Sequence, residues 1–194
     1  MSDQVRPVTL SASVLRHCPA CGASLGLVAP VVCGACGTEH WRNAKPCAGG
    51  LVTRDGKLLL VRRAIDPWRG CWDIPGGFCE ADEHPRQTVV REVREEVGLD
   101  VVVTGMLGIW MDVYGSQVGS SSADATMNCY YHAVALEDAE VTVDQAESSE
   151  AAWFAPDQLP AELAFPHHSG QVIDAWLAAP ASANVRADDA GASA

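Results

Sequence analysis

The chain has little positive charge and no long apolar segment. Its 194 residues include 13 lysines and arginines against 25 aspartates and glutamates, so the formal net charge is −12 at pH 7. Such a balance argues against broad binding to nucleic acid backbones, which calls for a basic surface. No run of about 18 apolar residues is present, and the first thirty residues lack a basic region followed by an apolar stretch. The sequence therefore indicates neither a membrane span nor a secretory signal, and we expect a cytoplasmic protein.

Length and composition fit one ordinary domain with a full hydrophobic core and a small appendage. Apolar residues make up 48% of the chain, and no internal repeat is visible. We predict a flexible leader over residues 1–13, a cysteine-containing unit over 14–45, a larger domain over 46–180 and a tail over 181–194. The tail has almost no large apolar side chain, so we expect it to be disordered.

Four of the eight cysteines are regularly spaced. Cys18 and Cys21 form one Cys-x2-Cys pair, and Cys33 and Cys36 form a second pair after eleven intervening residues. A glycine follows each pair, at the point where the backbone must turn tightly around the thiolates. The spacing predicts a tetrahedral zinc site in a small ribbon over 14–45, with a redox-active pair as the weaker alternative.

Further expectations concern the surroundings of this ribbon. A hairpin through Leu25 to Val32 would bring the two cysteine pairs together. His17 and His40 flank the cysteines, but four thiolates already complete a closed site, so we interpret both histidines as surface or packing residues. The remaining cysteines have no ligand spacing and are expected to be buried or half-buried free thiols; they are Cys47, Cys71, Cys79 and Cys129.

Three glutamates share one side of a predicted helix. Glu92, Glu95 and Glu96 stand at i, i+3 and i+4, so their carboxylates point in similar directions. Like charges at this spacing destabilise a bare helix, and hard oxygen ligands suit Mg²⁺ or Mn²⁺, so the pattern favours a divalent metal site. A solvated charged surface is the alternative for the three glutamates taken alone. Arg91 precedes Glu95 by four residues and could hold its carboxylate by an ion pair.

The same segment has the apolar pattern of a helix packed on a core. Val90, Val93 and Val97 recur at i, i+3 and i+7, nearly opposite the glutamates. Pro85 suits the first helical turn and Gly98 suits the residue just beyond the last one. These signals predict a helix with boundaries near 84 and 97.

The whole segment resembles the signature of the Nudix hydrolase family, G-x5-E-x7-R-E-U-x-E-E-x-G-U, where U is aliphatic. The chain upstream, with its Cys-x2-Cys pairs and the run Trp-Asp-Ile-Pro-Gly-Gly-Phe, is similar to bacterial members that have an amino-terminal zinc ribbon. The resemblance covers residues 18 to about 178. Every fixed position of the signature is matched, by Gly77, Glu83, Arg91, Glu92, Val93, Glu95, Glu96, Gly98 and Leu99.

This resemblance implies a metal-dependent enzyme and a set of ligands. Glu95 and Glu96 would be the principal ligands of Mg²⁺ or Mn²⁺, joined by the backbone carbonyl of Gly76 or a neighbour. Glu92 would be either a further ligand or the base that orients water. Such ions offset the charge repulsion that an attacking water meets at an anionic pyrophosphate.

Other site residues have less defined roles. Glu83 would support the entry to the helix or a second metal through water, and Arg91 would orient its neighbours. Family members take the general base from different places, frequently a later loop, so Glu147 and Glu150 are further candidates. A plain surface role is the usual one for exposed loop acids. His167 and His168 could approach a phosphate or cap the last helix, and we favour the cap.

The resemblance also implies an α+β fold, an α/β/α sandwich with a mixed sheet between helices. Short runs rich in β-branched and aromatic residues predict the strands, and Asp55-Gly56 predicts a hairpin turn. The polar stretch 114–124 is either a mobile loop or a substrate lid. The elements expected besides the signature helix are strands over 47–54, 57–63, 101–110, 127–136 and 151–154, a turn or short helix over 156–159, and a serine-capped helix over 169–178.

By resemblance to ribbon-bearing members, the substrate is a nucleoside diphosphate derivative such as ADP-ribose, FAD or NAD(H), cut to a nucleoside monophosphate and a second phosphate product. The serine-glutamine-proline-tryptophan run of the NADH-specific subgroup is absent. Candidate substrate contacts are Arg62, Arg63, Trp72 and Tyr114.

Four alternatives stay open. The enzyme could prefer nucleoside triphosphates or dinucleoside polyphosphates, and a silent nucleotide-sensing regulator is a rival of another class. Such a regulator would need a DNA-binding helical module, and none is visible. The ribbon could direct the same chemistry to a capped RNA, although few basic residues surround it. A homodimer is also left open.

Overall fold

A computed structural model of the chain describes residues 14–28, 30–41, 43–114, 124–136 and 139–179. The chain divides into two compact units, one formed by Met1–Lys45 with Met111–Met127 and the other by Pro46–Trp110 with Asn128–Ala194. The expected leader, the tail and most of the 114–124 loop lie outside the described residues. The four-part division of the chain stays a prediction.

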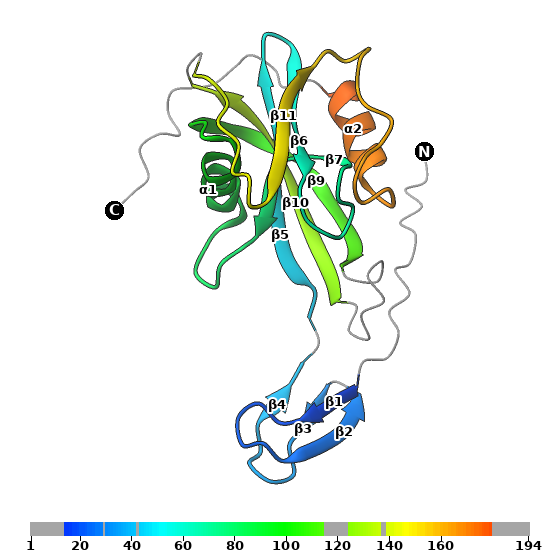
Figure 1. The fold of residues 1–194 in the computed structure, drawn as a ribbon. Coiled ribbons are helices and arrows are strands. Elements are labelled where there is room, and N and C mark those ends of the chain that lie inside the picture. Colours follow the sequence, from blue (N-terminus) through cyan, green and yellow to red (C-terminus); the bar gives the residue numbers. More distant parts are fainter. Residues whose placement is uncertain (1–13, 29, 42, 115–123, 137–138, 180–194) are drawn as a thin grey trace, which may run out of the picture. The chain divides into compact units, whose positions relative to one another are not determined.

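The main sheet has seven strands (Figure 1). They follow the order β11–β6–β5–β10–β9, with β7 paired to β6 and β8 paired to β5. The predicted strands are all present, and several are longer than expected. Their bounds are β5 Lys45–Arg54, β6 Lys57–Arg63, β7 Trp72–Asp73, β8 Gly76–Phe78, β9 Val101–Tyr114, β10 Asp124–Ala135 and β11 Ser148–Phe154.

The predicted hairpin between β5 and β6 is confirmed. Asp55 and Gly56 have φ values of 51° and 73°, and a two-residue type I′ turn needs positive φ at both central positions. The turn sets the register, in which Arg54 faces Lys57 across the two strands.

Two helices cover opposite faces of this sheet, α1 (Pro85–Val97) and α2 (Ser169–Ala178) (Figure 1). Two glycines of β5 leave room for neighbouring side chains, one from α1 and one from β10 of the same sheet. A Cβ atom on Gly50 would lie 2.8 Å from Val89 of α1, and one on Gly49 would lie 2.6 Å from the ring of Tyr130. Because successive strand residues face opposite sides, the two glycines admit a neighbour on each face. The expected α/β/α sandwich with a mixed sheet is confirmed.

The ends of α1 match the prediction. Pro85 is the first helical residue, and Gly98 ends the helix in the left-handed conformation with φ of 70°. The residue before the helix is His84, whose Nδ1 accepts a hydrogen bond from the Arg86 amide at 3.1 Å. The Gln87 side chain in turn accepts from the His84 amide at 2.9 Å, so donors of the first turn are satisfied on both sides.

The buried face of α1 differs from the one predicted. Val93 and Val97 are fully buried, but Val90 is 37% exposed and Val89 is buried instead. At about 100° per residue, Val89 and Glu96 point within about 20° of each other. Glu96 therefore lies within the valine face, where it is buried, and the prediction that the valines stand nearly opposite all three glutamates is wrong.

Helix α2 contributes Val172, Ile173 and Trp176 to a core cluster on the other face of the sheet. The predicted serine cap is wrong. His168 occupies the cap position without a side-chain cap hydrogen bond, and the Ser169 hydroxyl donates to the Ala164 carbonyl at 2.6 Å.

The small unit has two hairpins. Strand β1 (Val14–His17) pairs with β2 (Ser24–Val28), and β3 (Val31–Val32) pairs with β4 (Glu39–His40). The predicted hairpin through Leu25 to Val32 is therefore wrong, because β2 and β3 belong to separate two-stranded sheets. Each hairpin instead encloses one Cys-x2-Cys turn.

The tight turns expected after each cysteine pair are confirmed. Gly22 and Gly37 have φ values of 75° and 73°, and their amides donate to the carbonyls of Cys18 and Cys33 at 2.8 Å. No disulfide joins any of the eight cysteines, all of which lie in described segments. In the described part of the chain, neither helix has the length and apolar character needed to cross a membrane.

Candidate active site and cysteine cluster

Glu96 is a buried carboxylate at the centre of the candidate site. Its residue is 8% exposed, and its Oε2 accepts a hydrogen bond from the Gly76 amide at 3.3 Å. Burial raises its pKa well above the ordinary 4.5, and the charges of Asp73 and Glu92 raise it further. Within the described residues, no arginine, lysine or histidine forms an ion pair with it. The charged form of this carboxylate is therefore destabilised, and a bound cation would stabilise it.

Arg91 joins the other three acids. It donates to Glu83 through Nε and Nη2, each at 2.8 Å, and through Nη1 to Glu92 at 2.8 Å and Glu95 at 3.0 Å. Nη2 also donates to the carbonyl of Phe78 at 3.1 Å. The predicted ion pair between Arg91 and Glu95 is confirmed, and the hydrogen bond to Glu83 is the largest of several effects that raise the pKa of Arg91.

Glu83 is held from both sides. Besides Arg91, its carboxylate accepts hydrogen bonds from the Thr88 hydroxyl at 2.7 Å and the Glu80 amide at 3.2 Å. The hydrogen bonds from Arg91 are the main reason that the pKa of Glu83 falls to about 2. This carboxylate connects the loop before α1 to the first turns of the helix.

The remaining two glutamates differ in exposure. The Glu92 side chain is 12% exposed and burial raises its pKa, whereas the Glu95 side chain is 60% exposed. The Glu92 carboxylate lies against Gly77, where a Cβ atom would be 2.6 Å from Glu92 Cδ. Any side chain at position 77 would therefore displace Glu92.

The acids do not converge on one point in this arrangement. In the described residues, only the four ribbon cysteines form a group of at least three ligand atoms within 4.8 Å of one another. Arg91 holds Glu92 and Glu95, while Glu96 turns to the Gly76 amide. Glu92 and Glu95 each give one carboxylate oxygen to Arg91.

The sequence reasoning missed Asp73. Its side chain is 11% exposed, forms an ion pair with Arg63 at 2.9 Å, and has a pKa raised by burial. Its charge is the largest electrostatic influence on Glu96 after burial. The available signal was an acidic residue placed directly before the apolar pair Ile74-Pro75 and the glycines.

The candidate substrate contacts lie in different surroundings. Arg63 is committed to Asp73, whereas the Arg62 side chain is 44% exposed and pairs with Glu150 at 3.6 Å. Trp72 packs edge-on against Phe154, with ring centroids 4.9 Å apart. Tyr114 is the last residue of β9, and the substrate-binding roles of all four candidates stay predictions.

The late acids and histidines are also placed. Glu147 lies close enough to Glu92 and Glu96 for its charge to raise both of their pKa values. His168 is buried, and its Nε2 lies 2.8 Å from the Tyr130 hydroxyl. It stands at the start of α2 as expected, but its ring contacts the core and does not cap the helix.

The four spaced cysteines meet at one point. The sulfur atoms of Cys18 and Cys36 are 3.7 Å apart, and those of Cys21 and Cys33 are 3.8 Å apart. Four sulfurs at about 2.3 Å from a tetrahedral zinc ion would be about 3.8 Å from one another. The cluster thus has the donor set and spacing of a closed zinc site.

His40 contacts this cluster. It is buried, and its Nε2 lies 3.2 Å from the sulfur of Cys18. His40 is buried, as a packing residue would be, and it also gives the Cys18 thiol a polar partner that the spacing of the cysteines did not reveal. His17, in contrast, is exposed.

The chain resembles known proteins over most of its length. A family model described as the NUDIX domain matches residues 44–176. The chain is 31% identical over 169 residues to the NAD-capped RNA hydrolase NudC of Stutzerimonas stutzeri strain A1501, covering 84% of this chain and 56% of that protein. It is 43% identical over 61 residues to the ADP-ribose pyrophosphatase of Methanocaldococcus jannaschii, covering 31% of this chain and 36% of that protein.

The chain thus spans little more than half of one of these curated relatives and about a third of the other. Among solved structures, a NUDIX hydrolase from Nitrosomonas europaea has the same fold, with a TM-score of 0.69 and 24% identity. That likeness covers 86% of this chain and 92% of the other.

Proposed function

Because the chain belongs to the NUDIX family, we propose that it is a pyrophosphohydrolase that depends on a divalent metal ion. It cleaves the diphosphate linkage of a nucleoside diphosphate derivative, of the ADP-ribose, FAD or NAD(H) kind, into a nucleoside monophosphate and a second phosphate product. The observation that carries this proposal is the buried carboxylate of Glu96, which lies beside Asp73 and Glu92 without a paired cation in the described residues.

Mg²⁺ or Mn²⁺ suits this donor set, because both prefer carboxylate and carbonyl oxygen atoms. Glu92, Glu95 and Glu96 would hold the ion, together with the backbone carbonyl of Gly76. When bound, such an ion offsets the negative charge of the pyrophosphate and makes a bound water more acidic.

The chain's own residues prepare this site. The Gly76 amide orients Glu96, and the absence of a side chain at Gly77 leaves room for the Glu92 carboxylate. Arg91 donates to both Glu92 and Glu95 through Nη1, and its two bonds to Glu83 hold the guanidinium at the start of α1. Glu92 acts either as a ligand or as the base that orients water, and Glu147 is the alternative base.

The choice of substrate class is supported by the relatives. One is named for ADP-ribose and the other for NAD-capped RNA, and both substrates contain a nucleoside diphosphate linked to a second group. The match to the second relative covers 84% of this chain, so a capped RNA is a second candidate substrate. Against it stands the absence of the serine-glutamine-proline-tryptophan run of the NADH-specific subgroup.

The cysteine cluster has a separate, structural role in this proposal. Cys18, Cys21, Cys33 and Cys36 hold one zinc ion, which stabilises a ribbon too small to have a hydrophobic core of its own. A closed site with four protein ligands offers no open position for catalysis. We also propose that the enzyme is cytoplasmic.

The decisive experiment is a product-resolved screen with Mg²⁺ over ADP-ribose, FAD, NADH, diadenosine polyphosphates and nucleoside triphosphates. We expect a nucleoside monophosphate from one of the first three. Glu96→Gln should abolish turnover while the circular dichroism spectrum stays unchanged, and Glu162→Gln, at an exposed position, is the matched control. A strong preference for triphosphates would overturn the substrate class, and turnover retained by Glu96→Gln would remove its catalytic assignment.

A further inference from the structure

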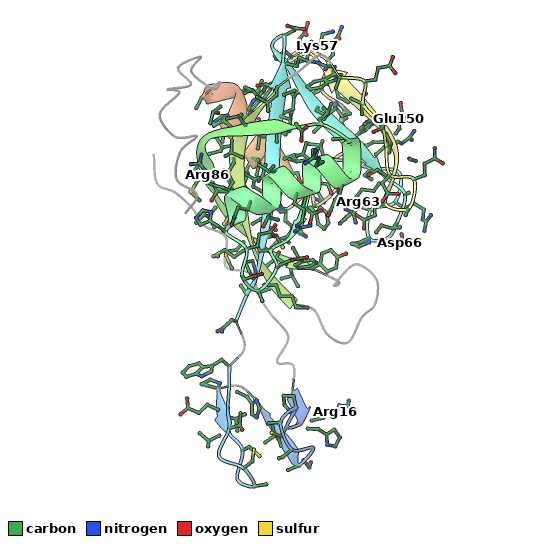
Figure 2. The ribbon with its side chains drawn as sticks, turned by 90° about the vertical axis from the view of Figure 1, so that its left-hand side faces the viewer. Arg16, Lys57, Arg63, Asp66, Arg86 and Glu150 are labelled. Atoms are coloured by element: carbon green, nitrogen blue, oxygen red, sulfur yellow. The ribbon has the colours of Figure 1, made fainter. Side chains whose placement is uncertain are left out.

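Arg63, the last residue of β6, is held by contacts on three sides. Its Nη1 donates to Asp73 at 2.9 Å, its Nε donates to the carbonyl of Pro67 at 2.7 Å, and its guanidinium lies over the ring of Phe165, 5.1 Å from the centroid. Figure 2 shows Arg63 toward one end of α1 and Arg86 toward the other. A side chain fixed in this way is poorly placed to follow a substrate, and its charge is directed at Asp73.

Asp73 is equally fixed. One carboxylate oxygen accepts from Arg63, and the other accepts from the Ile74 amide at 2.9 Å. Strand β7 lies between β6, where Val61 faces Asp73, and the segment around Leu163, which bridges to Trp72. The backbone of Asp73 is thus fixed in the sheet, and its carboxylate is held by Arg63 and the Ile74 amide.

The pair is connected to the candidate metal site through a short loop. Asp73 starts the run that leads to Gly76, whose amide donates to Glu96 at 3.3 Å. Contacts join Arg63 to Asp73 and Asp73 to the Ile74 amide, and a second contact joins Gly76 to Glu96; only the backbone through Pro75 links the two sets. Asp73 also places a second buried negative charge near Glu96.

We propose that Asp73, held by Arg63, is a positioning residue that raises the affinity of the site for its divalent cation. This inference rests on the function proposed above. Asp73 acts through its charge and through the loop that carries Gly76, and it is not itself a ligand. Partners that orient metal ligands typically contribute about 10- to 100-fold to metal affinity.

The test measures Mn²⁺ binding directly, by isothermal titration calorimetry of the full chain, beside kcat at saturating Mn²⁺. We expect Asp73→Asn to weaken Mn²⁺ binding by at least about 10-fold while kcat at saturation changes far less. Arg63→Gln should weaken Mn²⁺ binding to a similar extent, because this substitution releases Asp73. Arg63→Lys should retain more of the Mn²⁺ affinity than Arg63→Gln. The double variant should bind Mn²⁺ no more weakly than Asp73→Asn alone, because each substitution removes the same Arg63–Asp73 interaction.

Arg69→Gln is the matched control, because this exposed arginine in the neighbouring loop pairs only loosely with Asp66 at 3.9 Å. Tighter Mn²⁺ binding by Arg63→Gln would overturn the proposal, since Arg63 would then only oppose the cation. Wild-type affinity in Asp73→Asn would overturn it as well. If the wild-type protein binds no Mn²⁺ and hydrolyses nothing, both proposals fail. If the wild-type protein is active and Asp73→Asn binds Mn²⁺ with wild-type affinity, only the positioning role of Asp73 is overturned. Thermal unfolding of each variant separates lost folding from lost binding.

Discussion

Arg91 donates two hydrogen bonds to Glu83, from Nε to Oε1 and from Nη2 to Oε2, each 2.8 Å long. This bidentate geometry is the strongest arrangement that an arginine and a carboxylate form. Because Arg91 also contacts Glu92 and Glu95, the pair links the loop before α1 to the acids of the candidate site. The pair therefore positions these acids as well as joining the loop to the helix.

The Glu83–Arg91 pair predicts a specific dependence of stability on pH. The pKa of Glu83 is about 2 in the folded chain, below the ordinary 4.5. The stabilisation that ionised Glu83 contributes is therefore complete above about pH 4.5 and is lost as the pH falls through about 2. At pH 7, Glu83→Gln should lower the free energy of unfolding by about 2 kcal/mol.

Urea denaturation at pH 7, 4 and 3 measures the free energy of unfolding of the wild-type protein and of Glu83→Gln. The difference between the two should narrow as the pH falls. Glu80→Gln is the control, because only its backbone takes part in the network and its side chain is exposed. A difference that stays constant over this range would show that the charge of Glu83 is not responsible.

Gly77→Ala should impair catalysis more than folding. The added Cβ would meet the Glu92 carboxylate, and a displacement of about 1 Å in a catalytic group can cost about 100-fold in rate. We expect kcat to fall by that order, measured on the best substrate of the screen. Gly105→Ala, whose Cβ would meet nothing within 4 Å, should leave kcat unchanged; equal effects of the two variants would argue against the contact.

His40→Ala should weaken zinc binding by about 10-fold, because His40 is the polar partner of the Cys18 sulfur. Competition with a chromophoric chelator measures this affinity. His17→Ala, at an exposed position, should bind zinc as the wild-type protein does. Cys33→Ser should lose the single zinc equivalent, and zinc retained by that variant would contradict the four-cysteine site.

Two neighbouring valines of α1 test its buried face. Val93 is fully buried and Val90 is 37% exposed, so Val93→Ala should lower the free energy of unfolding by about 2 kcal/mol. Val90→Ala should change it by no more than about 0.5 kcal/mol. Chemical denaturation of both variants compares them, and a larger loss for Val90→Ala would restore the original prediction.

Local features of the sequence predicted local structure well. Pro85 and Gly98 mark the ends of α1, and Asp55-Gly56 marks the β5–β6 turn, because each requires a backbone conformation that few other residues favour. The cysteine spacing predicted a cluster for a similar reason, since residues three apart in a tight turn are already neighbours. Errors occurred where two faces of similar apolar content compete, as with Val89 and Val90.

The amino-acid sequence alone was sufficient for the family, the signature helix and the four-cysteine cluster, because these depend on spacing along the chain. Contacts between segments far apart could be found only in the folded protein. Asp73 reaches the neighbourhood of Glu96 because the strand that follows it, β8, contacts α1, and His40 reaches Cys18 because two hairpins close on each other. Such contacts follow from the packing of whole elements, and no spacing within one segment encodes them.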